Sequence, residues 1–213
     1  MAPFFAVAPK PPRLSYVEAA SVPIGALTAW QGLFDRARLR PGERVLVHGG
    51  AGAVGIFAIQ LARLHGARVI ATTSSPNAEL VISLGAEQAI DYREQRFEEF
   101  VNEVDVVFDT VGGETLERSW GILKPGGRMV TIASTADDSL DPRVREAFFI
   151  VEPNQKQLVE IGDLADDGRL RTVVDAVVPL WRAPEAYAGQ APRHHRGKVV
   201  VDVRIARTEE DRQ

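Results

Sequence analysis

The chain has 213 residues, of which 45% are hydrophobic and 25% are charged, a composition typical of a folded globular protein. Its net charge of −4 argues against a protein that binds nucleic acid or an anionic membrane surface. It contains no cysteine, which excludes disulfides and cysteine-ligated zinc. No apolar run approaches the ~20 residues of a membrane helix. We therefore expect a cytoplasmic protein that acts on a small molecule, with neither nucleic acid nor a membrane as partner.

The first half of the chain alternates amphipathic helices with short apolar strands. Residues 1–14 are rich in proline and predict an extended lead-in. A capping-box pattern at Ser15 and Glu18 opens a short helix. Apolar residues at steps of three and four then predict a second helix from Ile24 to Ala37. Buried strands and intervening helices follow in turn, with strands at 44–49, 67–72 and 88–91 and helices at 54–64, 76–84 and 94–101.

The alternation continues to about Pro153 and then changes. Strands are expected at 104–109, 128–133 and 147–151, with a helix within 112–123. This order predicts an α/β fold, a doubly wound parallel sheet. A helix from Pro153 to Asp167 and two further strands, separated by a short helix from Pro184, are expected to lie outside that sheet. The predicted division is a lead-in at 1–23, a parallel-sheet domain at 24–152, a small C-terminal α+β segment at 153–205 and a disordered tail at 206–213.

A glycine loop lies between the first strand and the helix that follows it. Gly50, Gly52 and Gly55 have G-x-G-x-x-G spacing. In this context the first glycine permits a tight turn, the second lets the backbone approach a pyrophosphate, and the third brings the helix against the strand. The helix N-terminus presents free N–H groups to the phosphates. The pattern predicts a dinucleotide site, and the alternative is a glycine-rich turn without a ligand.

The residues after the second strand favour NADP over NAD. An NAD site normally has a carboxylate there, which binds the adenosine ribose, but no Asp or Glu occurs between Gly52 and Glu79. Three hydroxyl side chains stand in its place: Thr73, Ser74 and Ser75. Neutral hydroxyls can donate to a 2′-phosphate, and Tyr92 and Arg93 are expected to close over the same group. The two serines could instead cap the next helix, or divide the two tasks between them.

Several other polar residues are expected to be structural. His48 should pack at the end of the first strand, and Asp109 should cap the loop after its own strand. His194 and His195 are expected in a solvated turn, because a metal site would need more ligands than the sequence offers there. No residue is singled out as catalytic, and no metal site is expected.

Five stretches carry a resemblance to a known family: "AASVPIGALTAWQGL", "PGERVLVHGGAGAVGIFAIQLARLHGARVIATTS", "LGAEQAIDYRE", "VDVVFDTVGGETLERSWGILKPGGRMVTIA" and "HRGKVVVDV". They follow in the order seen in medium-chain dehydrogenases/reductases, and the chain most resembles the zinc-independent quinone oxidoreductase branch. The resemblance implies a Rossmann domain that binds NADP(H), and reduction of quinones or α,β-unsaturated carbonyls. It also implies a GroES-like catalytic domain, most of which we expect this chain to lack. The C-terminal segment would be a remnant of that domain.

The resemblance implies cofactor contacts along the whole chain. They are Thr28 at the nicotinamide ribose, Ala53 and Val54 at the pyrophosphate, Ser74 and Tyr92 at the 2′-phosphate, Val111 and Gly112 beside the adenosine, Ile132, Ala133 and Ser134 past the nicotinamide, Phe148, Phe149 and Val151 near the carboxamide, and Lys198 from the C-terminal block. The family often has a lysine at the 2′-phosphate where this chain has Asn77. The strand at 147–151 would be the sheet edge through which two copies pair.

Two other functions fit parts of the pattern. A non-catalytic NADPH-binding module or sensor would keep the glycine loop and lose turnover. A class I methyltransferase has a similar sheet and a "KPGG" turn, but it needs acidic residues before its glycines and after its second strand. This chain has neither, so the methyltransferase is the weaker of the two alternatives.

Overall fold

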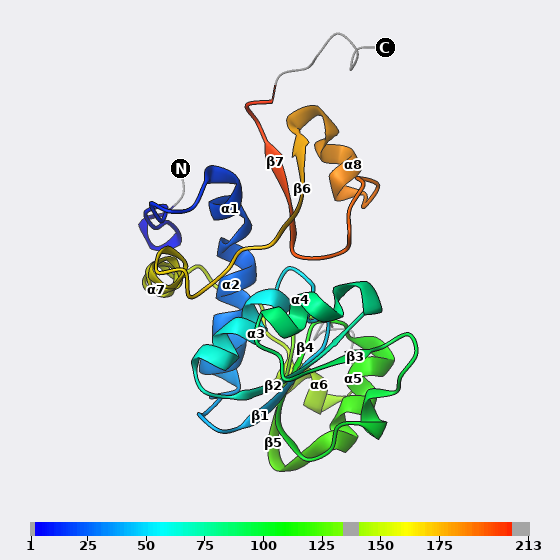
Figure 1. Ribbon diagram of the computed structural model, residues 1–213. Helices are drawn as coiled ribbons and strands as arrows, with labels where there is room; N and C mark the ends of the chain where they lie inside the picture. Colours follow the sequence, from blue (N-terminus) through cyan, green and yellow to red (C-terminus); the bar gives the residue numbers. More distant parts are fainter. Residues whose placement is uncertain (1–2, 134–140, 206–213) are drawn as a thin grey trace.

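The computed structural model describes residues 3–133 and 141–205. Five strands form a parallel sheet in the order β3-β2-β1-β4-β5, and two more form a separate parallel sheet (Figure 1). The strands are β1 (Arg44–Val47), β2 (Arg68–Thr73), β3 (Gln88–Asp91), β4 (Val104–Asp109), β5 (Leu123–Thr131), β6 (Val174–Pro179) and β7 (Lys198–Asp202). The doubly wound α/β fold expected from the sequence is confirmed.

Helices cover both faces of the five-stranded sheet. One face packs against α2, α3 and α4, and α7 lies on the outside of α2; the other face packs against α5 and α6. Their bounds are α1 (Tyr16–Ser21), α2 (Pro23–Trp30), α3 (Gly55–Leu64), α4 (Ala78–Ser83), α5 (Gly113–Ser119), α6 (Pro142–Ala147), α7 (Gln155–Asp166) and α8 (Ala183–Tyr187). Among the described residues, no helix is long and apolar enough to cross a membrane.

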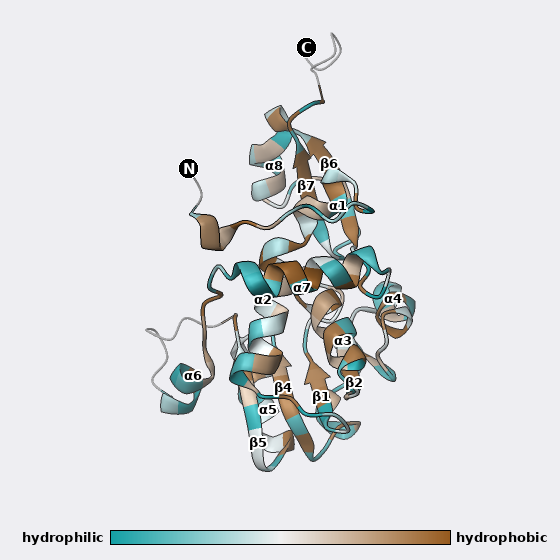
Figure 2. Cartoon of the chain, turned by 90° about the vertical axis from the view of Figure 1, so that its left-hand side faces the viewer, coloured by the Kyte–Doolittle hydropathy of each residue, from teal (hydrophilic) through white to brown (hydrophobic). Residues whose placement is uncertain are grey.

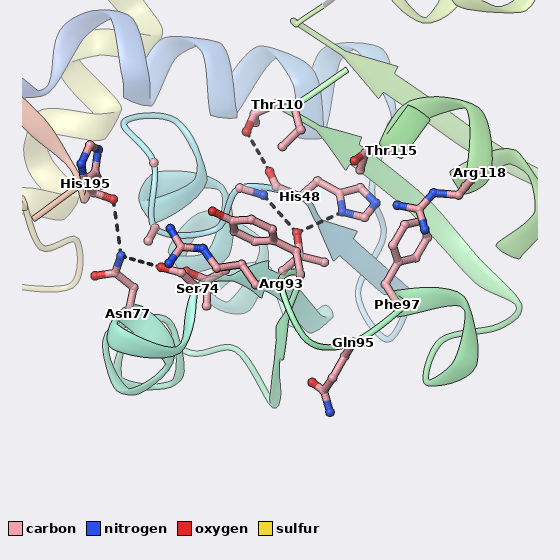
Figure 3. A pocket seen from close by; sticks show the side chains of 17 residues that line it. His48, Ser74, Asn77, Arg93, Gln95, Phe97, Thr110, Thr115, Arg118 and His195 are labelled. Carbon is pink, nitrogen blue, oxygen red and sulfur yellow. Dashed lines mark hydrogen bonds between the residues drawn. The ribbon is translucent and has the colours of Figure 1, made fainter. Parts of the chain in front are cut away.

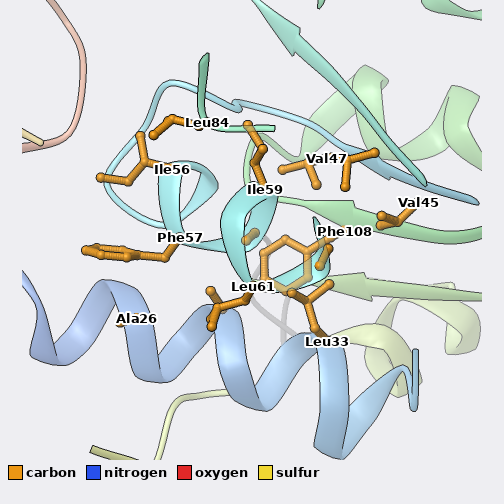
Figure 4. Packing of buried hydrophobic residues seen from close by; sticks show 14 of the residues in the cluster. Ala26, Leu33, Val45, Val47, Ile56, Phe57, Ile59, Leu61, Leu84 and Phe108 are labelled. Carbon is orange, nitrogen blue, oxygen red and sulfur yellow. The ribbon is translucent and has the colours of Figure 1, made fainter. Parts of the chain in front are cut away.

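The strands are apolar throughout because the sheet is buried on both faces. Along β1, Val45 and Val47 point toward α2 and α3, whereas Leu46 points toward the opposite layer. Figure 2 shows hydrophobic central strands between helices that carry hydrophilic residues. Phe108 of β4 is fully buried beside residues of α3 and of the segment after α2 (Figure 4).

The helix expected over 24–37 is divided in the structure. After α2 the chain widens into a π-helical segment, η2 (Gln31–Arg36). Gly32 lies in that segment against the Phe108 ring, where an added Cβ would lie 2.0 Å from Cε2. Ile24, expected on the buried face, is 63% exposed.

Two further expectations were wrong in part. The strand expected at 147–151 is reduced to one parallel bridge between Thr131 and Phe148, because α6 already takes up its first residue. The helix expected at 94–101 contains only a 3-10 turn at Phe97–Glu99. One turn is enough there, because it buries both Phe97 and Val101 against the sheet.

The C-terminal segment has the predicted order of strand, short helix and strand. β6 and β7 are parallel, and α8 lies in the connection between them. This small sheet packs against α1. The domain limits at 23, 152 and 205 stay predictions, and the tail expected at 206–213 lies outside the described residues.

Candidate functional site

A cavity of about 510 Å³ opens where the first four strands end (Figure 3). Its lining includes residues at or directly after the carboxyl ends of β1, β2, β3 and β4. In open parallel sheets ligands bind at this edge, at the point where the strand order reverses. Here that point lies between β1 and β4, which are neighbours in the sheet but distant in sequence.

The three motif glycines serve different purposes. The positive φ that the turn requires, +71°, belongs to Gly49 and not to Gly50 as expected. A Cβ on Gly50 would lie 2.8 Å from the Cβ of Ala71, and one on Gly55 would lie 2.2 Å from a backbone oxygen of the loop. A Cβ on Gly52 would meet only one atom, at 3.1 Å. Gly52 lines the cavity, so its missing side chain leaves room for a ligand rather than for neighbouring protein.

The N-terminus of α3 offers hydrogen-bond donors beside this loop. The N–H of Ile56 donates to the carbonyl oxygen of Gly52 at 3.1 Å. Within the described part of the chain, the preceding N–H groups of Ala53, Val54 and Gly55 have no acceptor. The helix is ten residues long, so its dipole adds a positive end to these donors. The arrangement suits an anionic group such as a pyrophosphate.

The two serines after β2 have separate tasks. The N–H and the hydroxyl of Ser75 both donate to the Asp91 carboxylate. Hydrogen bonds from the Ser75 hydroxyl and from the Arg93 N–H hold the pKa of Asp91 below its ordinary value. Ser74 lines the cavity together with Thr73, Tyr92 and Arg93. The sequence left this division open, and the structure assigns Ser75 to the local turn.

Asn77 connects this wall of the cavity to the C-terminal segment. It is buried, and its Nδ2 donates to Ser74 Oγ and to the carbonyl oxygen of His195, each at 3.4 Å (Figure 3). A second link joins the N–H of Gly197 to the carbonyl oxygen of Ala51 at 2.7 Å. His195 lines the cavity, so the expectation of a merely solvated turn was incomplete.

His48 lies at the inner end of the cavity in a closed hydrogen-bond network. Its Nε2 is 2.9 Å from the hydroxyl of Ser119, which itself donates to a backbone carbonyl. Nε2 must therefore carry the proton, and Nδ1 accepts from Thr72 Oγ1 at 3.1 Å. The same Thr72 oxygen accepts from the N–H of Gly49 at 3.3 Å. The network fixes the neutral tautomer and holds the first turn of the glycine loop.

Burial lowers the pKa of His48 to about 4. The side chain is 1% exposed and its ring meets the edge of Phe97. The nearby Asp109 carboxylate favours the charged form but does not offset the loss of solvation. His48 therefore stays neutral at pH 7, as a packed residue at the strand end.

Asp109 caps the loop after β4, as expected. Its carboxylate accepts from the N–H groups of Val111 and Gly112 and from the hydroxyl of Thr131. The side chain is fully buried. It therefore shapes the rim of the cavity, and it is not among the residues that line it.

The structure brings only part of the predicted set to this cavity. Six of the predicted residues line it: Gly52, Thr73, Ser74, Tyr92, Arg93 and Val111. Thr28 is buried in α2 and donates to a carbonyl one turn earlier. The rest do not line it, and their cofactor contacts stay predictions: Gly50, Ala53, Val54, Gly55, Ser75, Gly112, Ile132, Ala133, Phe148, Phe149, Val151 and Lys198. Ser134 lies outside the described residues.

The cavity also includes residues that sequence reasoning missed. They are His48, Gly49, Ala51, Thr72, Asn77, Gln95, Phe97, Thr110, Thr115, Arg118 and His195. Thr110 could have been found, because it directly follows β4 at the same sheet edge. His195 opens the "HRGKVVVDV" stretch whose Lys198 the resemblance links to the cofactor, but only the tertiary fold brings His195 itself to the cavity. Of the lining residues that the structure describes, none is acidic.

Comparison with known proteins identifies the family. A family model described as zinc-binding dehydrogenase matches residues 84–201, more than half of the chain. The chain belongs to this family. The resemblance to quinone oxidoreductase-like medium-chain dehydrogenases/reductases is therefore confirmed. Among the described residues there is no group of three or more His, Cys, Asp or Glu side chains that could hold a metal.

Three individual proteins illustrate the likeness. A probable zinc-binding oxidoreductase of Arthroderma benhamiae is 36% identical over 92% of this chain and 65% of its own length. The 2-methylene-furan-3-one reductase of Solanum lycopersicum is 36% identical over 92% of this chain and 49% of its own length. The quinone oxidoreductase of Thermus thermophilus, solved also in complex with NADPH, is 38% identical with a TM-score of 0.72, over 92% of this chain and 68% of that one. The chain thus spans about half to two thirds of these proteins.

Proposed function

We propose that the chain binds NADPH in this cavity and acts as a zinc-independent oxidoreductase on a quinone or an α,β-unsaturated carbonyl. The observation that carries the proposal is the end of β2. It presents Thr73 and Ser74 to a cavity whose described lining holds no carboxylate but does hold Arg93, Arg118 and His195. Such a lining favours a cofactor with a 2′-phosphate. The carboxylate that binds the ribose 2′-hydroxyl in NAD sites is absent from this described lining.

The residues present suit the parts of this cofactor. The free N–H groups at the start of α3 and the open side of Gly52 suit the pyrophosphate. Ser74 and Arg93 suit the 2′-phosphate, because a hydroxyl and a guanidinium both donate to phosphate oxygens. When bound, NADPH supplies the hydride that a quinone or the β-carbon of an enone accepts. The protein's part is to hold and orient the dinucleotide along the carboxyl edge of the sheet.

The similar proteins support the substrate class. One is named a quinone oxidoreductase, and another reduces a 2-methylene ketone according to its name. The test is oxidation of NADPH, followed at its absorbance band, with a panel of quinones and enones and with a chelator present in parallel. The proposal expects turnover that the chelator leaves unchanged. Absence of turnover with every acceptor would overturn the proposed reductase activity. Loss of turnover in the presence of the chelator would overturn the proposed independence from zinc.

A non-catalytic NADPH-binding module is the second candidate. It needs only the glycine loop and the cavity, which the described residues supply. It predicts that NADPH binds and that no acceptor in the panel is reduced. A class I methyltransferase would instead bind S-adenosylmethionine, which the same titration can include.

We also propose that two copies pair through the sheet edge at 147–151. The outer edge of β5 is covered there by a single bridge to Phe148, and an open strand edge tends to find a partner. Light scattering coupled to size exclusion measures the mass directly. A dimer that the substitution Ile150→Pro converts to a monomer is expected, and a clean monomer of the unaltered chain would overturn this proposal.

A further inference from the structure

The positive charges of the cavity lie at two separate places. Arg118 is at the inner end, where its guanidinium lies over the Phe97 ring at 5.0 Å and pairs with Glu98 at 2.9 Å. Near Ser74 the basic side chains that line the cavity are Arg93 and His195. No Lys or Arg occurs between positions 69 and 92. The segment that follows β2 therefore brings no cation of its own to its end of the cavity.

The loop that carries His195 is held from several directions. Asp175 of β6, whose side chain is 2% exposed, accepts from the N–H of His194 at 2.8 Å and from that of Arg196 at 3.3 Å. On the cavity side, the His195 carbonyl accepts from Asn77, and the loop also donates to the glycine loop through the N–H of Gly197. The backbone around His195 is thus fixed on one side to β6 and on the other to Asn77 and the glycine loop.

His195 itself has an unusual backbone conformation. Its φ is +56°, in the left-handed region that residues other than glycine seldom adopt. Such conformations persist where the surrounding structure fixes them, and they gather at ligand clamps. Here the neighbouring hydrogen bonds fix the conformation, and they hold the residue at the edge of the cavity beside Asn77 and Ser74 (Figure 3).

We propose that His195 is a specificity-determining residue that supplies a second positive charge to the 2′-phosphate, in addition to Arg93. The inference rests on the proposed binding of NADPH. Asn77 donates to Ser74 Oγ, so the Ser74 proton stays available to the same phosphate oxygens. A phosphate carries close to two negative charges at neutral pH, and it favours the protonated form of a neighbouring imidazole. The cation comes from the C-terminal segment because the loop after β2 has none.

The test compares two nucleotides that differ only in the 2′-phosphate. Binding of adenosine 2′,5′-bisphosphate and of adenosine 5′-monophosphate is measured by calorimetry at pH 6.5 for the full chain, for His195→Asn and for His194→Asn. Asparagine tolerates the left-handed conformation and removes the charge. The adjacent His194 is the matched control, because its ring lies 3.4 Å from Asp175 and does not line the cavity.

The proposal expects His195→Asn to weaken the bisphosphate about fivefold, as for one partly exposed charge pair, and to leave the monophosphate unchanged. Unchanged monophosphate binding also shows that the variant is folded. His194→Asn should match the unaltered chain with both ligands. If His195→Asn weakened both nucleotides equally, or neither, His195 would not discriminate and the inference would be overturned while NADPH binding stood. If the unaltered chain bound both nucleotides equally, the preference for NADPH and this inference would fall together.

Discussion

His48 makes the stability of the fold depend on pH. Its pKa is about 4 in the folded chain and about 6.5 when unfolded. Between these values the unfolded state binds the proton and the folded state does not, so stability rises with pH and is lost as pH falls. A shift of this size corresponds to about 3 kcal/mol in full, and to about 2 kcal/mol between pH 7.5 and pH 5.

The substitution His48→Gln isolates this contribution, because glutamine is neutral at both values. At pH 7.5 the variant should be less stable by about 1–3 kcal/mol, since a buried hydrogen-bond partner is lost. At pH 5 that difference should shrink by about 2 kcal/mol, because the unaltered chain loses stability and the variant does not. Urea unfolding followed by tryptophan fluorescence measures both values, with the exposed His65→Gln as control. An equal difference at the two pH values would refute the buried neutral histidine.

Four further substitutions test the site and its frame. Gly52→Ala should leave the melting temperature nearly unchanged and weaken NADPH binding about tenfold or more. Gly55→Ala should destabilise the fold by about 2 kcal/mol or more, because its Cβ meets backbone atoms. The opposite ranking of the two variants in thermal unfolding and NADPH titration would contradict the roles given to these two glycines. Asp109→Asn should cost about 2–3 kcal/mol in urea unfolding, since an amide cannot accept from all three donors; an unchanged midpoint would speak against the cap. Burial raises the pKa of Asp105, but the Lys124 ammonium and a backbone N–H outweigh it and lower that pKa below its ordinary value. Its stabilising effect is therefore present above about pH 4 and lost below it, and Asp105→Asn should flatten the acid limb of the stability curve relative to the unaltered chain.

The sheet could be predicted from sequence because its strands are short, wholly apolar and separated by glycine and proline turns. The same reasoning placed Ser74, Tyr92 and Arg93 at one edge, since parallel strands end together there. It failed where a tertiary contact decides the local structure. The π-helical segment follows from Gly32 meeting the Phe108 ring, which no local pattern reveals.

The C-terminal part of the site shows the same limit. His195 and Asn77 are 118 residues apart, and no local pattern in the sequence indicates that they meet. Their contact depends on where β6 and β7 place the connecting loop. The sequence also left the tasks of Ser74 and Ser75 undecided, and Asp91 at the end of β3 gives Ser75 a hydrogen-bond partner in the local turn.

Binding of reduced nicotinamide cofactors tests the central claim most directly. NADPH and NADH are titrated separately into the full chain, and the fluorescence of the reduced nicotinamide reports binding. The account predicts that NADPH binds at least about tenfold more tightly than NADH, a difference of about 1.4 kcal/mol. Equal affinities, a preference for NADH, or no binding of either cofactor would contradict it.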